Sequence, residues 1–524
     1  MKTNLTQQNP KVQTIGFKNL ALKGFFEAID VNKEGYISPQ KFWNELKIYG
    51  ILESDPRLKD IRSKFNNTYS QNKKGIDFQL FSESIDQSVL LTKTFRGELV
   101  IPDFKGFCDE IIDIYGEVEE NMGGAVANYI PQLARVNPEQ FAVSICTIDG
   151  QRFDYGDFDT NFCLQSTCKP INYCIAHEEL GEEKVHKHIG REPSGRSFNE
   201  MALNNDGLPH NPLINAGAIM CSSLIDRKSA IADRFDMVMN TWSQLTGDDN
   251  ISFNNSVYLS ERQTADRNFA LAYFMSEKKA FPENTNLIET LEFYFQCCSI
   301  ELKSSSMAGA AATLANGGVN PTSGRRVFSA STAKNCLSLM NSCGMYDFSG
   351  EYAFKIGFPA KSGVSGAMLI VIPNVMGICV WSPNLDELGN SVRGVEFSKR
   401  LGERFNFHNY DSLINNDEKI DPRKKKYENK IDNVIALIYA ASHGDIDEIK
   451  KIEAKGIDLN SADYDGRTAL HLAASEGQQE VVEYLIQRNV KGDLKDRWGG
   501  TPVKDAKRVK NVKIVQLLEN YLAN

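Results

Sequence analysis

The sequence predicts an α/β protein of several domains, in which a mixed helix-and-sheet central domain lies between an N-terminal helical domain and C-terminal helical repeats. Three observations lead to this prediction. The chain has 524 residues, more than one hydrophobic core normally organises. Strand-like segments stand at both ends of the central region, with helical segments between them. The C-terminal region repeats itself at a fixed spacing.

Composition narrows the class of protein. Hydrophobic residues make up 41% of the chain and charged residues 24%, which is typical of globular proteins. The net charge of -9 argues against binding to nucleic acid, which favours a basic face. No apolar run is long enough to cross a bilayer, so no membrane insertion is expected.

Two features bear on where the protein resides. Met1–Pro10 has neither the apolar core of a secretion signal nor the Arg- and Ser-rich bias of a strong transit peptide. The 11 cysteines are scattered without regular spacing, which indicates reduced, buried thiols in an intracellular compartment. A mitochondrial and a cytoplasmic location both remain open.

The N-terminal region, residues 15–95, is expected to be an EF-hand-like helical domain. Four helices are expected, at Phe17–Ile29, Pro39–Ile48, Arg57–Tyr69 and Phe78–Ser88. The loop Asp30–Ile37 resembles the first part of a calcium-binding loop, with Gly35 at its sharp turn. Its twelfth position is Lys41, where a glutamate should ligate the ion. We therefore expect no metal here.

The central domain is expected over residues 110–410, after a linker at Ile101–Phe104. The elements expected are a helix at Phe107–Glu120, a hairpin of Phe141–Ile148 and Gln151–Tyr155, helices at Pro170–Leu180 and Met307–Ala315, and strands at Val364–Pro373 and Val375–Ser382. Asp149-Gly150 suits the hairpin turn, and Gly181 suits a helix end. Strands from both ends of the region predict one sheet with helices packed on it.

The last part of the chain consists of repeats. Residues 411–430 are polar and include the basic run Pro422–Lys426, which we interpret as a solvated linker rather than a nuclear import signal. In residues 431–524, Ala440–Gly444 recurs as Ala473–Gly477, a spacing of 33 (473 − 440). With Thr468–Ala474 this matches the ankyrin signature. Such repeats either bind a partner protein in their groove or pack against the same chain.

The pair Ser166 and Lys169 is the first candidate for chemistry. Three residues apart on a helical turn, the two side chains lie on one face. A serine hydroxyl needs a base to take its proton, and a lysine serves once its pKa is lowered. Ser-x-x-Lys also occurs at Ser38/Lys41, Ser70/Lys73, Ser276/Lys279 and Ser331/Lys334. Only Ser166 has an apolar, strand-to-helix setting.

A second motif predicts the fold of the central domain. Lys361-Ser362-Gly363 precedes the expected strand Val364–Pro373. Such a triad lies on an edge strand beside Ser-x-x-Lys in acyl-serine hydrolases, where it presents a lysine and backbone N–H groups to a pocket. Together the two motifs predict a serine β-lactamase/penicillin-binding-like central domain.

The order of further motifs resembles the serine-dependent glutaminases, and the flanking domains resemble the animal kidney- and liver-type members of that family. The matching segments are Tyr129–Ala134, Gln165–Pro170, Glu192–Gly195, His210–Ala218, Ser260–Arg262, Asp266–Asn268, Phe293–Gln296, Gly344–Gly350 and Lys361–Gly366. The resemblance implies hydrolysis of L-glutamine to L-glutamate and ammonia, in glutamine catabolism and glutamate biosynthesis. It implies no cofactor and no metal, and a homo-oligomer that is a dimer or a homotetramer.

The resemblance also implies a role for each site residue. Ser166 would attack the side-chain amide, Lys169 would be its base, and Tyr346 would relay protons. Backbone N–H groups of Ser166 and Val364 would form the oxyanion hole. The remaining substrate-binding residues would be Asn215, Glu261, Asn268 and Tyr294 at the amino-acid end, with Tyr129 and Gln165 lining the pocket.

Each of these residues also has a structural interpretation. Tyr294 lies in an aromatic helix face, Asn215 suits a helix start, and Glu261 and Asn268 would otherwise be surface residues. One departure concerns Glu200, which stands where better-known animal members carry a basic residue. That puts phosphate activation and filament assembly in doubt.

Two other functions remain as alternatives. A penicillin-recognising acyl-serine hydrolase would share the fold, but the chain has no Ser-Asp-Asn triplet. A catalytically inactive scaffold would use only its ankyrin repeats. An intact Ser166, Lys169 and Tyr346 set argues against the scaffold.

Overall fold

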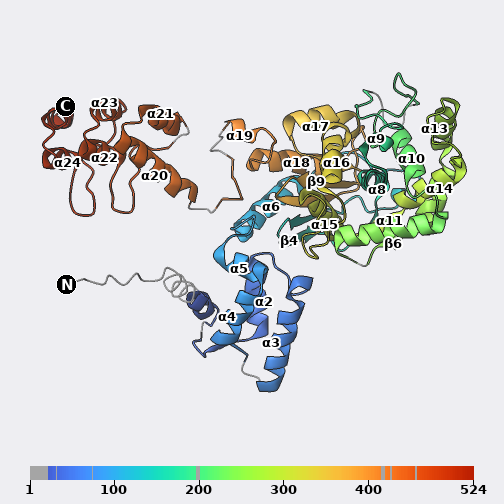
Figure 1. The fold of residues 1–524 in the computed structure, drawn as a ribbon, viewed down its shortest axis with the longest axis horizontal. Helices are drawn as coiled ribbons and strands as arrows, with labels where there is room; N and C mark the ends of the chain where they lie inside the picture. The colour runs from blue at the N-terminus through green and yellow to red at the C-terminus, as the bar shows by residue number, and fades with distance from the viewer. Residues whose placement is uncertain are drawn as a thin grey trace, which may run out of the picture. The chain divides into compact units, whose positions relative to one another are not determined.

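The computed structural model describes residues 22–30, 32–72, 75–195, 201–248, 250–414, 419–424, 428–454 and 457–523. It divides into two compact units, Met1–Asn409 and Tyr410–Asn524. Figure 1 traces both. Within the described ranges, none of the helices combines the length and apolar character needed to cross a membrane. Met1–Pro10 and Glu200 lie outside the described residues.

A five-stranded antiparallel sheet organises the first unit, and it is built from both ends of the central region as predicted. Its strands lie in the order β4-β3-β10-β9-β8. Their bounds are β3 Ala142–Thr147, β4 Arg152–Gly156, β8 Ala360–Ser362, β9 Ala367–Ile372 and β10 Met376–Trp381. The β3–β4 hairpin turns at Asp149 and Gly150, and Gly150 has φ +86°.

The sheet separates two hydrophobic cores. Along β9, Ala367, Leu369 and Val371 belong to one core, whereas Met368, Ile370 and Ile372 belong to the other. This alternation follows from the two-residue period of a strand. Both faces of the sheet are buried, so the strand is a continuous run of apolar residues and does not alternate apolar with polar residues.

Helices cover both faces of the sheet (Figure 1). Helix α15 (Ser304–Ala315) packs on β10, β3 and β9, and α6 (Phe104–Glu119) and α18 (Val392–Arg404) contribute to the opposite core. Small residues in α15 allow a close approach, because a Cβ at Gly377 would lie 2.1 Å from the Ala312 nitrogen. The apolar run at Met307–Ala315 is therefore a buried helix, as expected.

The remaining elements of this unit build the region around the candidate site. They are α7 Pro131–Ala134, β5 Phe162–Cys163, η2 Gln165–Cys168, α8 Lys169–Leu180, α9 Glu182–Val185, α10 Asn215–Leu224, α11 Ile231–Thr246, β6 Ser252–Phe253, α12 Asn255–Gln263, α13 Asp266–Glu277, α14 Leu287–Cys298, β7 Ile300–Leu302, α16 Ala330–Cys343, η3 Tyr346–Phe348 and α17 Ser349–Lys355. Strands β5, β7 and β6 form a second small sheet.

Two boundaries in the central region differ from the prediction. The strand expected from Val364 begins at Ala367, because Lys361 and Ser362 form a separate edge strand, β8, followed by a turn at Gly366 with φ +86°. The linker expected at Ile101–Phe104 is shorter. Helix α6 begins at Phe104, since the Asp103 side chain accepts a hydrogen bond from the Gly106 N–H and caps it.

The N-terminal domain is helical, as predicted. It contains a helix at 22–29, then α2 Pro39–Ile48, η1 Pro56–Leu58, α3 Lys59–Asn72, α4 Phe78–Gln87 and α5 Val89–Arg96, with short paired strands β1 Tyr36–Ile37 and β2 Ile76–Asp77. Helix α5 was not anticipated. Asp30 accepts hydrogen bonds from the Glu34 and Gly35 N–H groups. Among the described residues, no three acidic, histidine or cysteine side chains are grouped to hold a metal ion.

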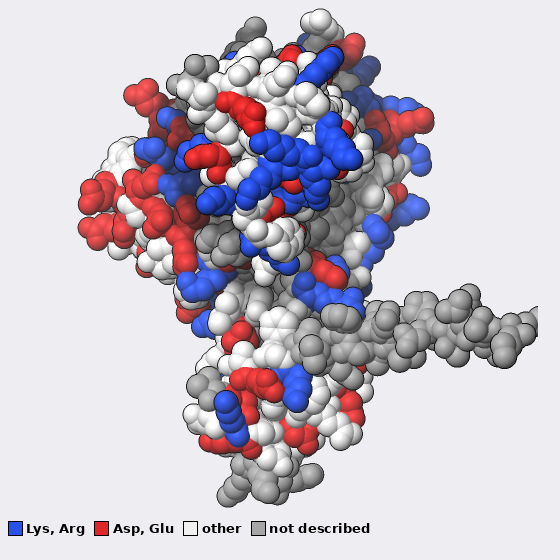
Figure 2. Space-filling model, turned by 90° about the vertical axis from the view of Figure 1, so that its left-hand side faces the viewer, with Lys and Arg blue, Asp and Glu red and all other residues white. Residues whose placement is uncertain are grey.

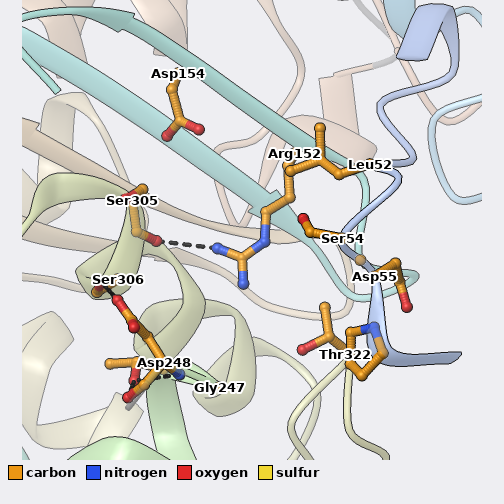
Figure 3. A pocket seen from close by; sticks show the side chains of 13 residues that line it. Leu52, Ser54, Asp55, Arg152, Asp154, Gly247, Asp248, Ser305, Ser306 and Thr322 are labelled. Atoms are coloured by element: carbon orange, nitrogen blue, oxygen red, sulfur yellow. Dashed lines mark hydrogen bonds between the residues drawn. The ribbon is translucent and has the colours of Figure 1, made fainter. Parts of the chain in front are cut away.

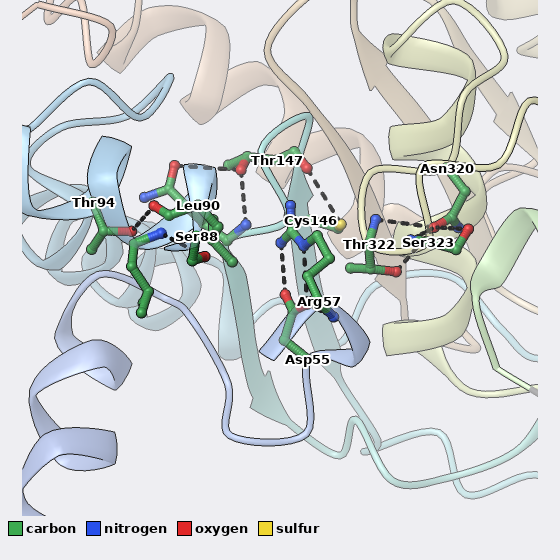
Figure 4. A network of polar contacts seen from close by, with 12 residues as sticks. Asp55, Arg57, Ser88, Leu90, Thr94, Cys146, Thr147, Asn320, Thr322 and Ser323 are labelled. Carbon is green, nitrogen blue, oxygen red and sulfur yellow. Dashed lines mark hydrogen bonds and ion pairs between the residues drawn. The ribbon is translucent and has the colours of Figure 1, made fainter. Parts of the chain in front are cut away.

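The N-terminal domain docks on the β3–β4 turn of the sheet. Asp149 accepts from Lys93 Nζ at 3.0 Å and from the Val100 N–H at 2.6 Å. Gln151 donates to the carbonyls of Tyr49 and Ile101, both at 3.0 Å. Figure 4 shows polar contacts near this turn, among them those of Thr147, whose Oγ1 accepts from the Gln151 N–H at 3.0 Å. The hairpin turn is therefore part of an interdomain junction.

The second unit consists of stacked helix pairs. Their bounds are α20 Glu428–His443, α21 Ile446–Ala454, α22 Ala469–Glu476, α23 Gln479–Gln487, α24 Pro502–Arg508 and α25 Val512–Ala523. Thr468 begins α22 with a capping box to His471. The segment expected as a linker also contains the short helix α19 Asp411–Ile414. On the face drawn in Figure 2, basic and acidic side chains are interspersed.

Candidate active site

Ser166 lies where the chain passes from a strand into a buried helix. Strand β5 leads into the turn η2, which continues as α8. Gln165, directly before the serine, has φ +50°, a left-handed conformation that is costly for a residue with a side chain. Ser166 is 8% exposed. The expected helix is present, with Lys169 as its first residue and Gly181 as its cap.

Lys169 is fully buried and its amine is held by an amide. Its exposed fraction is 0%, and Nζ donates to Asn215 Oδ1 at 2.6 Å. Burial lowers the pKa of Lys169 to about 8, because a buried ammonium loses its hydration. A neutral amine with one N–H fixed in this way keeps a lone pair to accept a proton.

Tyr346 joins the serine to the edge strand. Its hydroxyl donates to the Ser362 carbonyl at 3.1 Å and also hydrogen-bonds to the side chain of Ser166. Burial raises the pKa of Tyr346 above its ordinary value. Its φ of +53° is a second left-handed non-glycine conformation at this site. Two strained residues beside one nucleophile are typical of a functional site.

The sequence predicted that Lys361 would face the cavity, but the structure places its side chain elsewhere. Its side chain is fully buried, and its Nζ lies 4.2 Å from the centre of the Tyr346 ring and 2.6 Å from the Ser362 carbonyl oxygen. Burial, and then the charge of Lys169, lower the pKa of Lys361 well below its usual value. Because β8 directs its side chain into the protein interior, Lys361 packs against the ring of Tyr346 instead of lining the cavity.

A buried carboxylate forms the opposite side of the site. Glu261, on α12, is 8% exposed. It accepts from Tyr129 Oη at 2.6 Å and from Gln165 Nε2 at 2.9 Å. Burial raises the pKa of Glu261, and the two hydrogen bonds oppose that rise. The surface position that the sequence also allowed for Glu261 is wrong.

Side chains from three further helices complete this side. Asn215 begins α10 and donates from Nδ2 to Asn268 Oδ1, on α13, at 3.3 Å. Tyr294, on α14, is 4% exposed, and burial raises its pKa. Asn215 therefore connects Lys169 with Asn268 through the two ends of one amide.

These residues surround one cavity of about 300 Å³. Its lining contains Tyr129, Gln165, Ser166, Asn215, Glu261, Asn268, Tyr294 and Val364. Lys169 and Tyr346 stand behind this lining and touch it through Asn215 and Ser166. The structure thus brings the ten predicted catalytic and substrate-binding residues together, whereas Lys361 is not part of the lining.

Other lining residues were not anticipated. They are Thr264, Ala265, Arg267, Phe295 and Cys298. Arg267 lies inside the motif Asp266–Asn268, and this position, together with its cationic side chain, could have indicated from the sequence that it lines the cavity. Tyr346 also borders a second cavity, of about 400 Å³, together with Ser194 and Gly195. Residues 196–200, which follow Gly195 in the sequence, lie outside the described residues.

Comparison with known protein families assigns all three regions. The family model described as glutaminase matches residues 124–410. A model of an EF-hand domain matches residues 23–102, and a model of ankyrin repeats matches 411–497 and 437–522.

Relatives cover nearly the whole chain. The mitochondrial liver isoform of glutaminase from Mus musculus is 46% identical over 485 residues, which is 92% of this chain and 81% of the relative. The putative glutaminase 3 of Caenorhabditis elegans is 46% identical, over 93% of this chain and 85% of the relative. A glutaminase of Trichormus variabilis is 42% identical, over 58% of this chain and 90% of its own.

Solved structures agree on the central domain. The structure of a probable glutaminase, YbaS, has a TM-score of 0.55 and 35% sequence identity, and covers 57% of this chain and 96% of its own. The native form of Mglu has a TM-score of 0.54 and 33% identity, over 57% of this chain and 72% of its own. The chain belongs to the glutaminase family.

Proposed function

We propose that the protein hydrolyses L-glutamine to L-glutamate and ammonia through an acyl-enzyme on Ser166. One observation carries this proposal: a buried serine with a buried lysine and tyrosine behind it opens on a cavity of about 300 Å³ whose far side holds a buried carboxylate. Family membership supports the choice of glutamine, because the relatives are named for that activity.

The first step forms a bond between Ser166 Oγ and the side-chain carbonyl carbon of glutamine. Neutral Lys169 takes the hydroxyl proton as the bond forms. A pKa of about 8 supports this role, since it leaves part of the enzyme with a neutral amine at neutral pH. The hydrogen bond to Asn215 Oδ1 fixes the amine while its lone pair accepts the proton.

The second step expels ammonia. The tetrahedral carbon regains its carbonyl as the C–N bond breaks, and the departing nitrogen receives a proton through Tyr346. The hydrogen bond between Tyr346 and Ser166 supports this relay. The phenol suits proton donation because burial favours its neutral form. Backbone N–H groups of Ser166 and Val364 stabilise the oxyanion, and one such donor is typically worth about a hundredfold in rate.

Water completes the cycle. It attacks the acyl carbon and gives a proton to the same relay, and the ester bond to Ser166 Oγ breaks to release L-glutamate. The serine recovers its proton from Lys169. With the substrate and one water molecule, the side chains of Ser166, Lys169 and Tyr346 account for every proton transferred.

The amino-acid end of the substrate lies toward Glu261. This carboxylate pairs with the substrate ammonium, and its hydrogen bonds from Tyr129 and Gln165 keep it oriented. Asn215, Asn268 and Tyr294 provide amide and phenol donors for the substrate carboxylate. Because Glu261 is buried, a ligand that lacks an ammonium group would leave the Glu261 carboxylate without a positively charged partner.

Ammonia release tests the proposal. The purified full chain should release ammonia from L-glutamine faster than from L-asparagine, whose amide is one methylene short of the serine. Ser166→Ala should abolish the release. The absence of glutamine turnover by the wild type, or full turnover by Ser166→Ala, would contradict the mechanism.

We also propose that the chain self-associates as a dimer or tetramer through its central domain. Leu259 on α12 and Tyr273 on α13 support this, since their exposed fractions of 52% and 58% are high for large apolar side chains. Light scattering of the full chain and of Tyr273→Glu should show a smaller mass for the variant. A monomeric wild type would contradict the proposal.

The ankyrin repeats are proposed to bind a protein partner. Tyr464 is 96% exposed and Trp498 is 65% exposed, and aromatic side chains of this kind anchor protein interfaces. Hydroxyl-radical footprinting on cell extract should protect both residues. Unchanged labelling would favour the alternative, in which the repeats serve the same chain.

A further inference from the structure

A second polar cavity, of about 250 Å³, lies at the junction of the N-terminal and central domains, apart from the serine site. The N-terminal domain supplies one wall from the loop between α2 and η1, and the hairpin, the end of α11 and the start of α15 supply the others (Figure 3). Its lining residues are Leu52, Ser54, Asp55, Pro56, Gly150, Arg152, Asp154, Thr246, Gly247, Asp248, Ser305, Ser306 and Thr322.

The guanidinium of Arg152 lies in the middle of this cavity (Figure 3). Its Nη1 donates to the Ser305 carbonyl at 3.0 Å. The group rests on α15 at Gly309, where an added Cβ would lie 3.1 Å from Nη2. Across the described part of the chain, no carboxylate forms an ion pair with Arg152. A partly buried cation with donors left over therefore faces the cavity.

Acidic side chains also line the cavity. Asp248 accepts from Ser306 Oγ at 2.6 Å and from the Asn250 N–H at 2.9 Å, and these contacts help keep it ionised. Asp154 lies two residues further along β4, on the same face as Arg152, and burial raises the pKa of its carboxyl. Asp55 is already neutralised by two hydrogen bonds from Arg57, at 2.9 and 2.6 Å (Figure 4).

The lining thus offers separate charges of both signs. A dianion would meet repulsion from Asp248, and a simple cation would meet Arg152. We propose that the junction cavity binds a small zwitterion of the amino-acid class, with its carboxylate on Arg152 and its ammonium toward Asp248. A guanidinium fork suits a carboxylate in two-point contact. The proposal is independent of the reaction at Ser166.

The position of the cavity gives such a ligand a structural consequence. The loop Leu52–Pro56 and the hairpin belong to different domains. The Arg152 N–H already links the hairpin to the N-terminal domain, because it donates to the Gly50 carbonyl at 2.7 Å. A ligand held between both walls would stabilise the docked arrangement, because only that arrangement forms the site.

Glycine is the probe that tests this inference. Calorimetry on the full chain should show binding of glycine, and neither acetate nor methylammonium should bind comparably. Arg152→Gln and Asp248→Asn should each weaken glycine binding by about tenfold or more. Arg62→Gln is the matched control, since Arg62 also donates to a backbone carbonyl, that of Glu53 at 2.8 Å, outside the cavity. It should bind as the wild type does.

Ser54→Trp provides a test that leaves the charges in place. Ser54 is exposed and lines the cavity, so a large side chain there should block the ligand without disturbing the core. Absence of glycine binding by the wild type would overturn the proposal. So would binding that persists in Arg152→Gln and Ser54→Trp but is lost in Asn268→Ala, because it would place glycine at the serine site.

Discussion

The pKa of Lys169 sets how the rate of acylation depends on pH. The lysine is fully buried, and burial lowers its pKa to about 8. Only the neutral amine accepts the Ser166 proton. The acylation rate should therefore rise with pH until most of the enzyme carries neutral Lys169, and then level off.

The size of the effect follows from this pKa. With a pKa of about 8, about a tenth of the molecules carry neutral Lys169 at pH 7, and about nine-tenths do so at pH 9. At the ordinary value of 10.5, only about one molecule in 3,000 would be neutral at pH 7. Burial therefore raises the competent fraction about 300-fold at neutral pH.

The measurement is kcat/KM for L-glutamine from pH 6 to 9.5. It should rise about tenfold per unit well below pH 8 and reach a plateau above it. Lys169→Arg keeps the positive charge but cannot lose its proton in this range, so it should lack both the activity and the profile. A flat kcat/KM between pH 6 and 8, or the same inflection in Lys169→Arg, would rule out neutral Lys169 as the base.

Three further predictions follow from single substitutions. Lys169→Met should remove turnover yet raise the free energy of unfolding at pH 7 by up to about 3 kcal/mol, less about 1 kcal/mol for the lost hydrogen bond. The reason is that the lowered pKa of Lys169 in the folded state makes its protonated form unfavourable below pH 8, and this penalty fades between about pH 8 and 10.5. Urea unfolding of both proteins at pH 7 and at pH 10 measures the gain in stability and its loss. Glu261→Gln should raise KM for glutamine about 10- to 100-fold with a smaller change in kcat, and steady-state kinetics showing unchanged KM would exclude the ammonium pairing. Gly377→Ala should lower the free energy of unfolding by about 2 kcal/mol or more, because its Cβ would lie 2.1 Å from a backbone nitrogen, whereas Gly116→Ala, with nothing within 4 Å, should be neutral or stabilising in the same denaturation assay.

Local patterns were sufficient to predict much of the central domain. Asp149-Gly150 marked the hairpin turn, and Gly181 marked the end of α8. Apolar runs marked β9 and β10 because both faces of the sheet are buried. These features depend on residues close in sequence, which is why the sequence reveals them.

Contacts between distant segments were not predictable in the same way. Strand β8 has three residues, too few for a periodic pattern, and its pairing with β9 decides that Lys361 points inward. The bond from Lys169 to Asn215 joins residues on different helices. The role of Gln151 at the domain junction depends on carbonyls that precede it by many residues. Tertiary packing, rather than local preference, sets each of these.

The most direct test of the acyl-enzyme is mass spectrometry of the enzyme quenched in acid during turnover of L-glutamine. We expect a glutamyl group in ester linkage on the peptide that contains Ser166, and its absence in Ser166→Ala. A glutamyl group on another residue, or none at all while ammonia is released at full rate, would contradict it.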